Sequence, residues 1–291
     1  PVELQPYLGD LIRRALLPVQ RLTLKIAAIE QRSHFQIAGP RGDYVGIELG
    51  ADVSADLNLD DFMVFDNQPS RAIQFFRDLL FRHYKSVEAD AGVVGGPTTP
   101  QQFVSAVFTQ KNPFEELVAA AEGVPRDAIN VLGLSAQRAD KEPISILHVR
   151  GAAKAWFQRD KEAVVSANAK ARSLLYWIQD KVIAHRRARA FLLRSGERHP
   201  LVDALFDARV LHLVKRSVSA HDQPGVRYDV YKIDYGCFVD LLTTQKSPQG
   251  LLPLDEATDG ETHVDVPPDD YRAIRRAILD IGEFDESTTS P

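Results

Sequence analysis

The sequence lacks the features that mark secreted, membrane-spanning and zinc-bound proteins. Its 291 residues include a single cysteine, Cys237, so neither an internal disulfide nor a cysteine-rich zinc site can form. No uninterrupted apolar run approaches the roughly 20 residues that a membrane-spanning helix needs. The first residues, PVELQPYLGDLIRR, carry no signal-peptide pattern. We therefore expect a cytoplasmic protein that does not enter a membrane.

Motifs of several enzyme classes are also missing. The histidines show no HxxxH or HxH spacing, so we predict no metal site. No GxSxG motif occurs, which leaves a serine hydrolase without support. Cys237 lies in an apolar, strand-like context and is interpreted as a packing residue rather than a nucleophile. Asp60 and Asp61 are interpreted as the solvent-facing start of a strand rather than as a metal pair.

What is present is the composition of a folded protein with an uneven charge. Hydrophobic residues make up 44% and charged residues 26%, which excludes collagen-like and fully disordered chains. Residues 168–232 hold 13 Lys and Arg against 6 Asp and Glu, whereas residues 233–291 hold 4 against 13. A basic block before an acidic tail favours a surface for nucleic acid or another polyanion. A solvated helical face with a solubilising tail is the alternative.

The first 88 residues alternate helix and strand patterns. LQPYLGDLIRRALL predicts an amphipathic helix, and residues 22–30 predict an apolar strand buried on both faces. Residues 44–50 and 59–65 predict two further strands, and Ser70 is expected to cap the helix that follows. This order is typical of part of an α/β sheet.

A linker rich in glycine and proline, residues 89–100, precedes a run of helical patterns. Gly123 suits the end of one helix, and Pro125 suits the first turn of the next. Ser145 is predicted to cap a further helix. This part of the chain is therefore expected to be all-α.

The segment 168–243 has a different pattern. A basic amphipathic helix, a short strand at 190–195 and another helix precede two strands joined by a turn at Pro224–Gly225. Helices followed by strand, turn and strand are typical of a winged-helix module. Residues 244–291 then predict an acidic tail with one short helix, at 269–281.

Several stretches resemble the C-terminal two-thirds of a bacterial AAA+ ATPase of the origin-recognition type. They are PVELQPYLGDLIRRALL, LTLKIAAIEQRS, YVGIELGADVSADLNLDDFMVFDN, FEELVAAAEGVPRDAIN and ALFDARVLHLVKRSVSAHDQPGVRYDVYKIDYGCFVDL. The resemblance implies a partial α/β base at 1–88, a helical lid at 98–165 and a winged helix at 168–243. No GxxxxGK[ST] motif occurs, so we expect a fragment that starts after the Walker B strand. A naturally short chain is the alternative.

The resemblance implies roles for three residues of the lid. Gly123-Val124-Pro125-Arg126 is similar to the sensor-2 motif, in which an arginine reaches the γ-phosphate of ATP from the start of a helix. Arginine suits this role because it keeps its charge and binds phosphate oxygens through a planar fork. Gly123 and Pro125 belong to the same nucleotide-binding corner. The alternative is a surface arginine paired with Glu122 or Asp127.

The resemblance also implies a sensor-1 residue, which orients the attacking water from the end of a strand. The candidates by position are Glu30, Arg32 and Ser33, and we select Ser33 as the catalytic partner of Arg126. A strand end that turns into solvent is the alternative. An arginine finger is expected as well, and no spacing selects among Arg13, Arg14 and Arg41.

The implied function is an ATP-driven molecular switch. ATP and Mg²⁺ are expected in the intact protein, a possible homo-oligomer, and neither is expected to bind tightly to this chain alone. The rival hypothesis is a stand-alone adaptor with no nucleotide role. The winged helix is expected to bind duplex DNA or a protein partner. The basic candidates are Arg186, Arg187, Arg189, Arg194, Arg198, Arg209, Lys215, Arg216 and Arg227, of which Arg186, Arg187, Arg209, Lys215 and Arg216 are selected.

Overall fold

The computed structural model divides the chain into two compact units, Pro1–Asn58 and Leu59–Pro291. Helices and small antiparallel sheets are both present, which confirms a mixed α/β protein. The structure describes residues 4–29, 33–38, 43–48, 51–53, 57, 59, 63–90, 92, 95–196, 199–219, 225–242 and 278–284.

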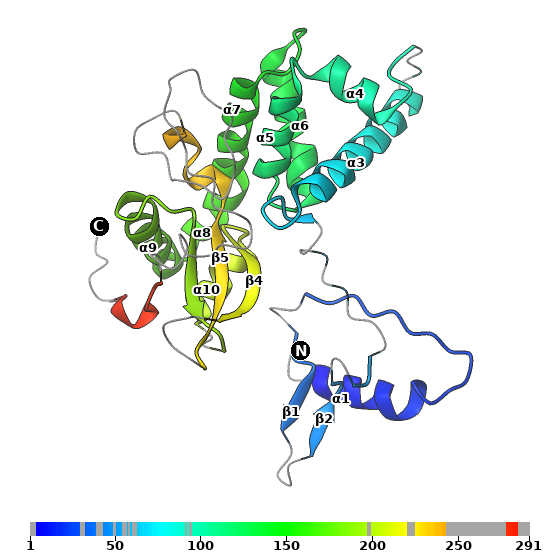
Figure 1. Cartoon of the computed structure of the whole chain (residues 1–291), viewed down its shortest axis with the longest axis vertical. Helices are drawn as coiled ribbons and strands as arrows, with labels where there is room; N and C mark the ends of the chain where they lie inside the picture. Colours follow the sequence, from blue (N-terminus) through cyan, green and yellow to red (C-terminus); the bar gives the residue numbers. More distant parts are fainter. Residues whose placement is uncertain are drawn as a thin grey trace. The chain divides into compact units, whose positions relative to one another are not determined.

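The described residues of the N-terminal unit form a helix, with a π-helical turn after it, and a hairpin. Helix α1 (Gln5–Leu11) continues into the π-helical turn η2 (Ile12–Leu16), as the amphipathic pattern predicts. Strands β1 (Gln36–Ala38) and β2 (Tyr44–Gly46) pair antiparallel (Figure 1). Gly46 has a φ of +130°, and a Cβ on it would lie 2.0 Å from the Phe35 carbonyl oxygen, so this position requires glycine.

The strand predicted at 22–30 is wrong for residues 22–29. These residues form no strand, and the side chains of Ile26 and Ile29 are 57% and 64% exposed. A strand buried on both faces needs neighbouring strands to bond its backbone groups. In the described part of this unit the only ladder joins β1 to β2, which leaves residues 22–29 without a partner strand.

The strand predicted at 59–65 is also absent where the structure describes it. Residues 63–67 form tight turns, in which the amide of Asn67 donates to the Val64 carbonyl at 3.1 Å. Val64 and Phe65 are buried, so their apolar character reflects packing rather than a strand period. Asp60 and Asp61 lie outside the described residues.

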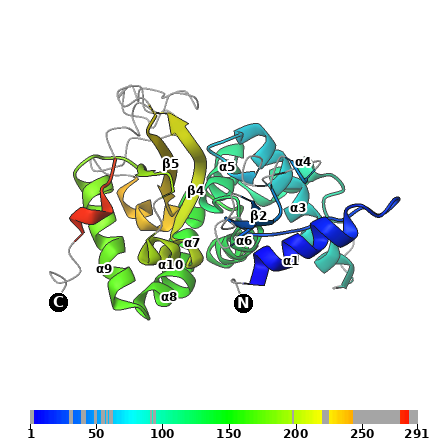
Figure 2. The ribbon, with the colours of Figure 1, turned by 90° about the horizontal axis from the view of Figure 1, so that it is seen from below.

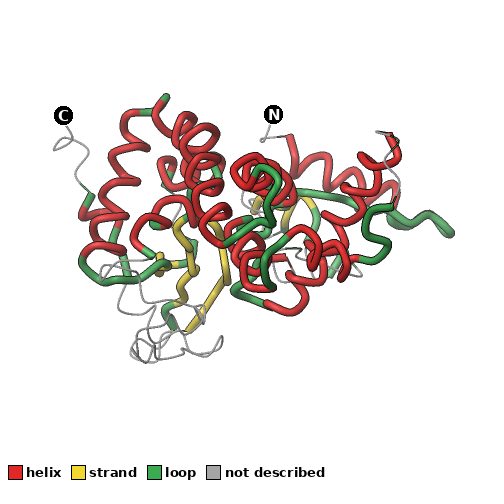
Figure 3. Tube along the Cα trace, turned by 90° about the horizontal axis from the view of Figure 1, so that it is seen from above, coloured by secondary structure: helices red, strands yellow, loops and turns green. Residues whose placement is uncertain are grey.

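Helices α3 to α7 follow in the second unit, and Figure 3 draws all helices in red. They are α3 (Pro69–Asp90), α4 (Pro100–Val107), α5 (Lys111–Ala120), α6 (Pro125–Ala139) and α7 (Ile146–Trp156). The helical patterns predict these elements correctly. Ser145 caps α7 as expected, because its hydroxyl accepts a hydrogen bond from the His148 amide. Ser70 is not a cap, since α3 already begins at Pro69.

The chain then enters a three-stranded antiparallel sheet with helices packed beside it (Figures 1 and 2). The elements are η4 (Phe157–Glu162), α8 (Ala163–Ser166), α9 (Ala169–Ile178), η5 (Gln179–Ala184), β3 (Ala190–Arg194), α10 (Pro200–Asp207), β4 (Leu211–Ser219) and β5 (Arg227–Ile233). The strand order is β3-β5-β4, so β3 and β4 are the edge strands. The strands predicted at 190–195 and on both sides of the turn are present. Pro224 of that turn lies outside the described residues.

Two short turns, η6 (Tyr235–Cys237) and η7 (Val239–Leu241), follow β5. The helix predicted at 269–281 is wrong over its described end, because Ile278 forms a bridge with Leu192 and the 3₁₀ turn η8 (Ile281–Glu283) follows it. A residue that bonds to a strand edge has extended backbone, which an α-helix excludes. Residues 269–277 lie outside the described part of the chain.

One main core joins the helices α3–α10 to the sheet. Its fully buried members include Phe76, Leu117, Leu174, Phe191 and Ile233. The expected lid and the expected winged-helix module therefore share a core within one unit. Within the described ranges, no helix combines the length and the apolar character that a bilayer crossing requires.

Candidate functional site

The corner between α5 and α6 places Arg126 at a helix start. Gly123 has a φ of +78°, and a Cβ on it would lie 3.1 Å from Val64 Cγ2 and 3.3 Å from the Val64 backbone nitrogen. A side chain would therefore be strained and crowded at this position. Pro125 begins α6, where its missing N–H has no intrahelical partner to lose. The predicted role of Pro125 in the first turn of a helix is confirmed, whereas α5 is capped by Ala121 and Gly123 lies in the connection between the two helices.

Arg126 is exposed and forms no side-chain ion pair among the described residues. It is the second residue of the 15-residue helix α6. Its carbonyl oxygen accepts a hydrogen bond from Asn130 Nδ2 at 2.7 Å. The alternative interpretation, a surface pair with Glu122 or Asp127, is wrong, because both carboxylates bind other cations inside the protein.

Glu122 belongs to a buried group of three charges, Asp66, Glu122 and Lys232, which we call the Lys232 cluster. Lys232 Nζ donates to Glu122 Oε2 at 2.7 Å and also to Asp66 Oδ2. All three side chains are 1% exposed. Asp66 Oδ1 and Glu122 Oε1 have no hydrogen-bond partner. One ammonium thus compensates two carboxylates.

The two acids of the Lys232 cluster have opposite pKa shifts. Burial dominates for Glu122 and raises the pKa of its carboxyl, although Lys232 opposes the shift. Burial also acts to raise the pKa of Asp66, but the charges of Lys232 and Arg189 outweigh it and lower that pKa. Lys232 accordingly holds its proton, since the two carboxylates raise its pKa against its own desolvation.

Asp127 belongs to a second group, which we call the Lys161 cluster. Asp127 is fully buried, with Lys161 Nζ 2.8 Å from Oδ2 and Arg209 Nη1 2.5 Å from Oδ1. Lys161 also pairs with Asp234, and His212 Nε2 lies 2.9 Å from Asp234 Oδ2. Arg209 pairs in addition with Asp160. Asp127 and Asp234 therefore each have two side-chain nitrogen partners.

Together these clusters decide the electrostatics of the corner. The carboxylates that flank Arg126 in sequence are both neutralised by buried cations, so the Arg126 charge stays uncompensated at the start of α6. The helix N-terminus adds partial positive charge at the same place. This combination favours contact with an anion, and a phosphate oxygen is the acceptor that a guanidinium fits best.

Ser33, the selected sensor-1 residue, does not lie at a strand end. Its hydroxyl donates to the Ile29 carbonyl at 2.7 Å, within a loop of the N-terminal unit. The expected strand before it is missing, so the positional argument for Ser33 no longer holds. The other two candidates, Glu30 and Arg32, lie outside the described residues.

The basic candidates of the expected winged helix do not share one element. Arg186 and Arg187 follow η5 and are exposed, whereas Lys215 and Arg216 lie on β4. Two of the wider set are corrected by the structure. Arg209 is bound in the Lys161 cluster, and Arg189 is buried with its guanidinium 5.8 Å from the Phe238 ring centroid. Burial excludes Arg189 from a DNA-facing surface, whereas the Arg209 guanidinium is 24% exposed and is held by Asp127 and Asp160.

Sequence reasoning missed both ion clusters. A signal was present at the end of β5 and just after it, where Lys232 and Asp234 alternate with the buried Tyr231, Ile233 and Tyr235. A charged residue within such an apolar run is rarely buried unless it is paired. The pattern therefore predicts buried partners, but it does not say which residues they are.

Comparisons with protein-family models, with curated proteins and with solved structures find no match for this chain. The function is therefore argued from the residues of the site.

Proposed function

We propose that this chain is the lid and C-terminal part of an ATP-driven molecular switch of the AAA+ type, in which Arg126 binds the terminal phosphate of ATP. The observation that carries the proposal is the exposed Arg126 guanidinium at the start of α6, with both flanking acids neutralised in the interior. An arginine in this position stabilises the charge that spreads over a transferring phosphoryl group.

The ion clusters supply a connection between such a nucleotide site and the sheet. Glu122 and Asp127 bracket the corner, and they bind Lys232 of β5 and Arg209 just before β4. A change in the position of the corner would therefore pull on the strands through buried ion pairs. In this way a change in the bound nucleotide would move the C-terminal module, as a molecular switch requires.

The residues fit part of a nucleotide site. Arg126 supplies one phosphate contact, but no group of three His, Cys, Asp or Glu among the described residues is arranged to hold Mg²⁺. The phosphate-cradling GxxxxGK[ST] motif does not occur in the 291 residues. ATP supplies the phosphoryl group when it is bound, and this chain contributes binding and charge stabilisation through Arg126. We expect no ATP hydrolysis by the 291 residues alone.

A role as an adaptor is the second candidate. The strand order β3-β5-β4, with α9 and α10 beside the sheet, supports a winged-helix-like module. A helix-turn-helix reader of DNA joins its two helices by a short turn. Here η5 and the strand β3 lie between α9 and α10. This difference favours a protein partner over duplex DNA.

The experiment compares ATP turnover of the complete gene product with that of its Arg126→Ala variant. Turnover should fall roughly 100-fold or more, because the lost contact acts mainly in the transition state. ADP affinity should change less, since ADP has no γ-phosphate. Arg138→Ala, a truncation of another exposed arginine near the other end of α6, is the matched control and should leave turnover unchanged. Equal turnover of the Arg126→Ala variant and the parent, at equal thermal stability, would refute the proposal.

A further inference from the structure

The segment 278–284 lies against the free edge of β3. Ile278 bridges Leu192 in parallel, and the Leu279 amide donates to the Leu192 carbonyl at 3.0 Å. Since β3 pairs with β5 on its other side, this contact adds backbone bonds to an edge that the sheet leaves open. Arg186 Nη1 also donates to the Ile278 carbonyl at 2.8 Å.

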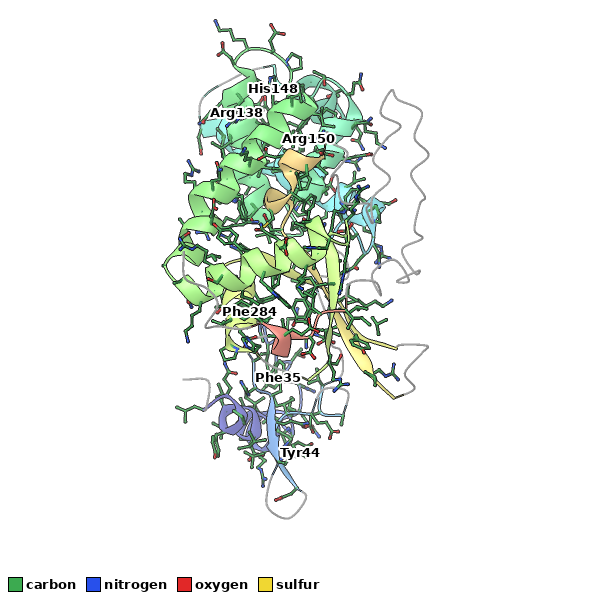
Figure 4. The ribbon with its side chains drawn as sticks, turned by 90° about the vertical axis from the view of Figure 1, so that its left-hand side faces the viewer. Phe35, Tyr44, Arg138, His148, Arg150 and Phe284 are labelled. Carbon is green, nitrogen blue, oxygen red and sulfur yellow. The ribbon has the colours of Figure 1, made fainter. Side chains whose placement is uncertain are left out.

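Two side chains anchor the segment. Leu279 and Phe284 are only 5% and 8% exposed, whereas Ile278 is 39% exposed. The Phe284 ring meets the Trp177 ring of α9 edge to face, with centroids 5.8 Å apart. Figure 4 shows Phe284 on the short turn that carries it. Leu279 and Phe284 therefore act as buried anchors of a short peptide.

The shape of the segment comes from its own turn. Asp280 Oδ1 accepts a hydrogen bond from the Gly282 amide at 2.8 Å, and the Phe284 amide donates to the Ile281 carbonyl at 3.0 Å. This 3₁₀ turn shortens the path between Leu279 and Phe284. Both anchors can then reach the protein from a stretch of seven residues.

The charges on the two sides are complementary. The segment carries Asp280 and Glu283, and the receiving surface carries Arg186 and Lys181, whose Nζ lies 6.0 Å from the Trp177 ring centroid. We call this receiving surface, formed by Leu192, Trp177, Lys181 and Arg186, the β3-edge site. Its chemistry is that of a surface which captures a short acidic peptide through a backbone bridge at the strand edge and an aromatic anchor.

We propose that the β3-edge site is a docking site for an acidic linear segment of a partner protein, with leucine and phenylalanine spaced as in Leu279 and Phe284. The chain's own segment 278–284 occupies the site in the absence of that partner. The segment belongs to the same chain as the site, so it competes with a partner segment as an intramolecular ligand. The partner segment displaces it by competition. This inference does not depend on nucleotide binding.

The test measures binding of a labelled synthetic peptide, residues 276–286, to the 291-residue chain by fluorescence anisotropy. Leu279→Ala/Phe284→Ala weakens the tethered competitor, so this variant should bind the peptide at least about tenfold more tightly than the unchanged chain. Ile278→Ala, which truncates an exposed side chain of the same segment, is the matched control and should bind like the unchanged chain.

A second pair of measurements examines the receiving surface. In the Leu279→Ala/Phe284→Ala background, Arg186→Glu should lower the affinity for the peptide by roughly fivefold or more. This loss of affinity should be smaller at high salt. A scrambled peptide of the same composition should not bind. Absence of peptide binding by the double variant, or equal binding by all variants, overturns the proposal. A dimer formed by exchange of segment 278–284 between two copies, seen as a concentration-dependent mass, also overturns it.

Discussion

The Lys232 and Lys161 clusters are built from the same residue types but differ in redundancy. Among the described residues, Lys232 is the one side chain that pairs directly with Asp66 and with Glu122. Around Lys161, Asp127 is also held by Arg209, and Asp234 lies beside His212. We therefore expect the loss of unfolding free energy on removing a buried lysine to depend on whether its carboxylate partners keep another cation, rather than on the number of ion pairs lost.

The largest effect is expected for Lys232→Met. This change leaves two buried carboxylates without their direct cation, and breaking a buried pair in this way costs about 3–5 kcal/mol of unfolding free energy. Urea unfolding measures the loss. Lys154→Met, which removes the exposed pair with Asp240, is the control and should cost less than about 1 kcal/mol. A loss in Lys232→Met no larger than in this control would contradict the assignment of the cluster.

Lys161→Met should destabilise less, by roughly 1–3 kcal/mol, because Asp127 keeps Arg209 and Asp234 keeps His212. The same urea experiment provides the comparison. If the two lysine variants lose equal stability, redundancy of partners is not what distinguishes the clusters.

Arg209→Gln tests the outer part of the Lys161 cluster. The arginine is 24% exposed, and Asp127 retains Lys161, so the expected loss is about 1 kcal/mol. DNA affinity, if duplex binding is measurable at about 50 mM salt, should not change. The double variant Arg186→Ala/Arg187→Ala should keep the stability of the parent. Its affinity for duplex DNA should be lower and should depend less on salt. Weaker DNA binding by Arg209→Gln at full stability would return Arg209 to the DNA-facing set.

The smallest effect concerns pH. The pKa of Glu122 is raised on folding, so its contribution to stability is present below its unfolded value and is lost as the pH rises through the folded value. The lowered pKa values of Asp66 and Asp234 act in the opposite sense, and their contribution is lost as the pH falls below about 4. Glu122→Gln should therefore remove part of the fall in stability as the pH rises, and it should leave the fall in stability at low pH unchanged. Urea midpoints from pH 3 to pH 9 measure both limbs. A Glu122→Gln profile that parallels the parent at every pH would contradict the shift.

Much of the helical part of the fold could be predicted from the sequence. Helices α3 to α7 follow from apolar periodicity, and Pro125 and Ser145 mark helix starts as expected. The strand predictions at 22–30 and 59–65 failed, because an apolar run looks the same in a strand, in a turn packed against a core and in an exposed loop. A strand exists only where another strand bonds to it, and that partner is not visible in a local pattern.

The backbone of the corner that presents Arg126 follows from the local sequence, because glycine permits a positive φ, proline fixes φ, and a helix N-terminus is a local property. The electrostatic surroundings of that arginine, in contrast, depend on tertiary contacts. Lys232 reaches Asp66 across 166 positions and Glu122 across 110 positions of the chain. Ion pairs of this kind form when the core brings distant segments together. A buried charge costs much free energy unless the packing places an opposite charge next to it.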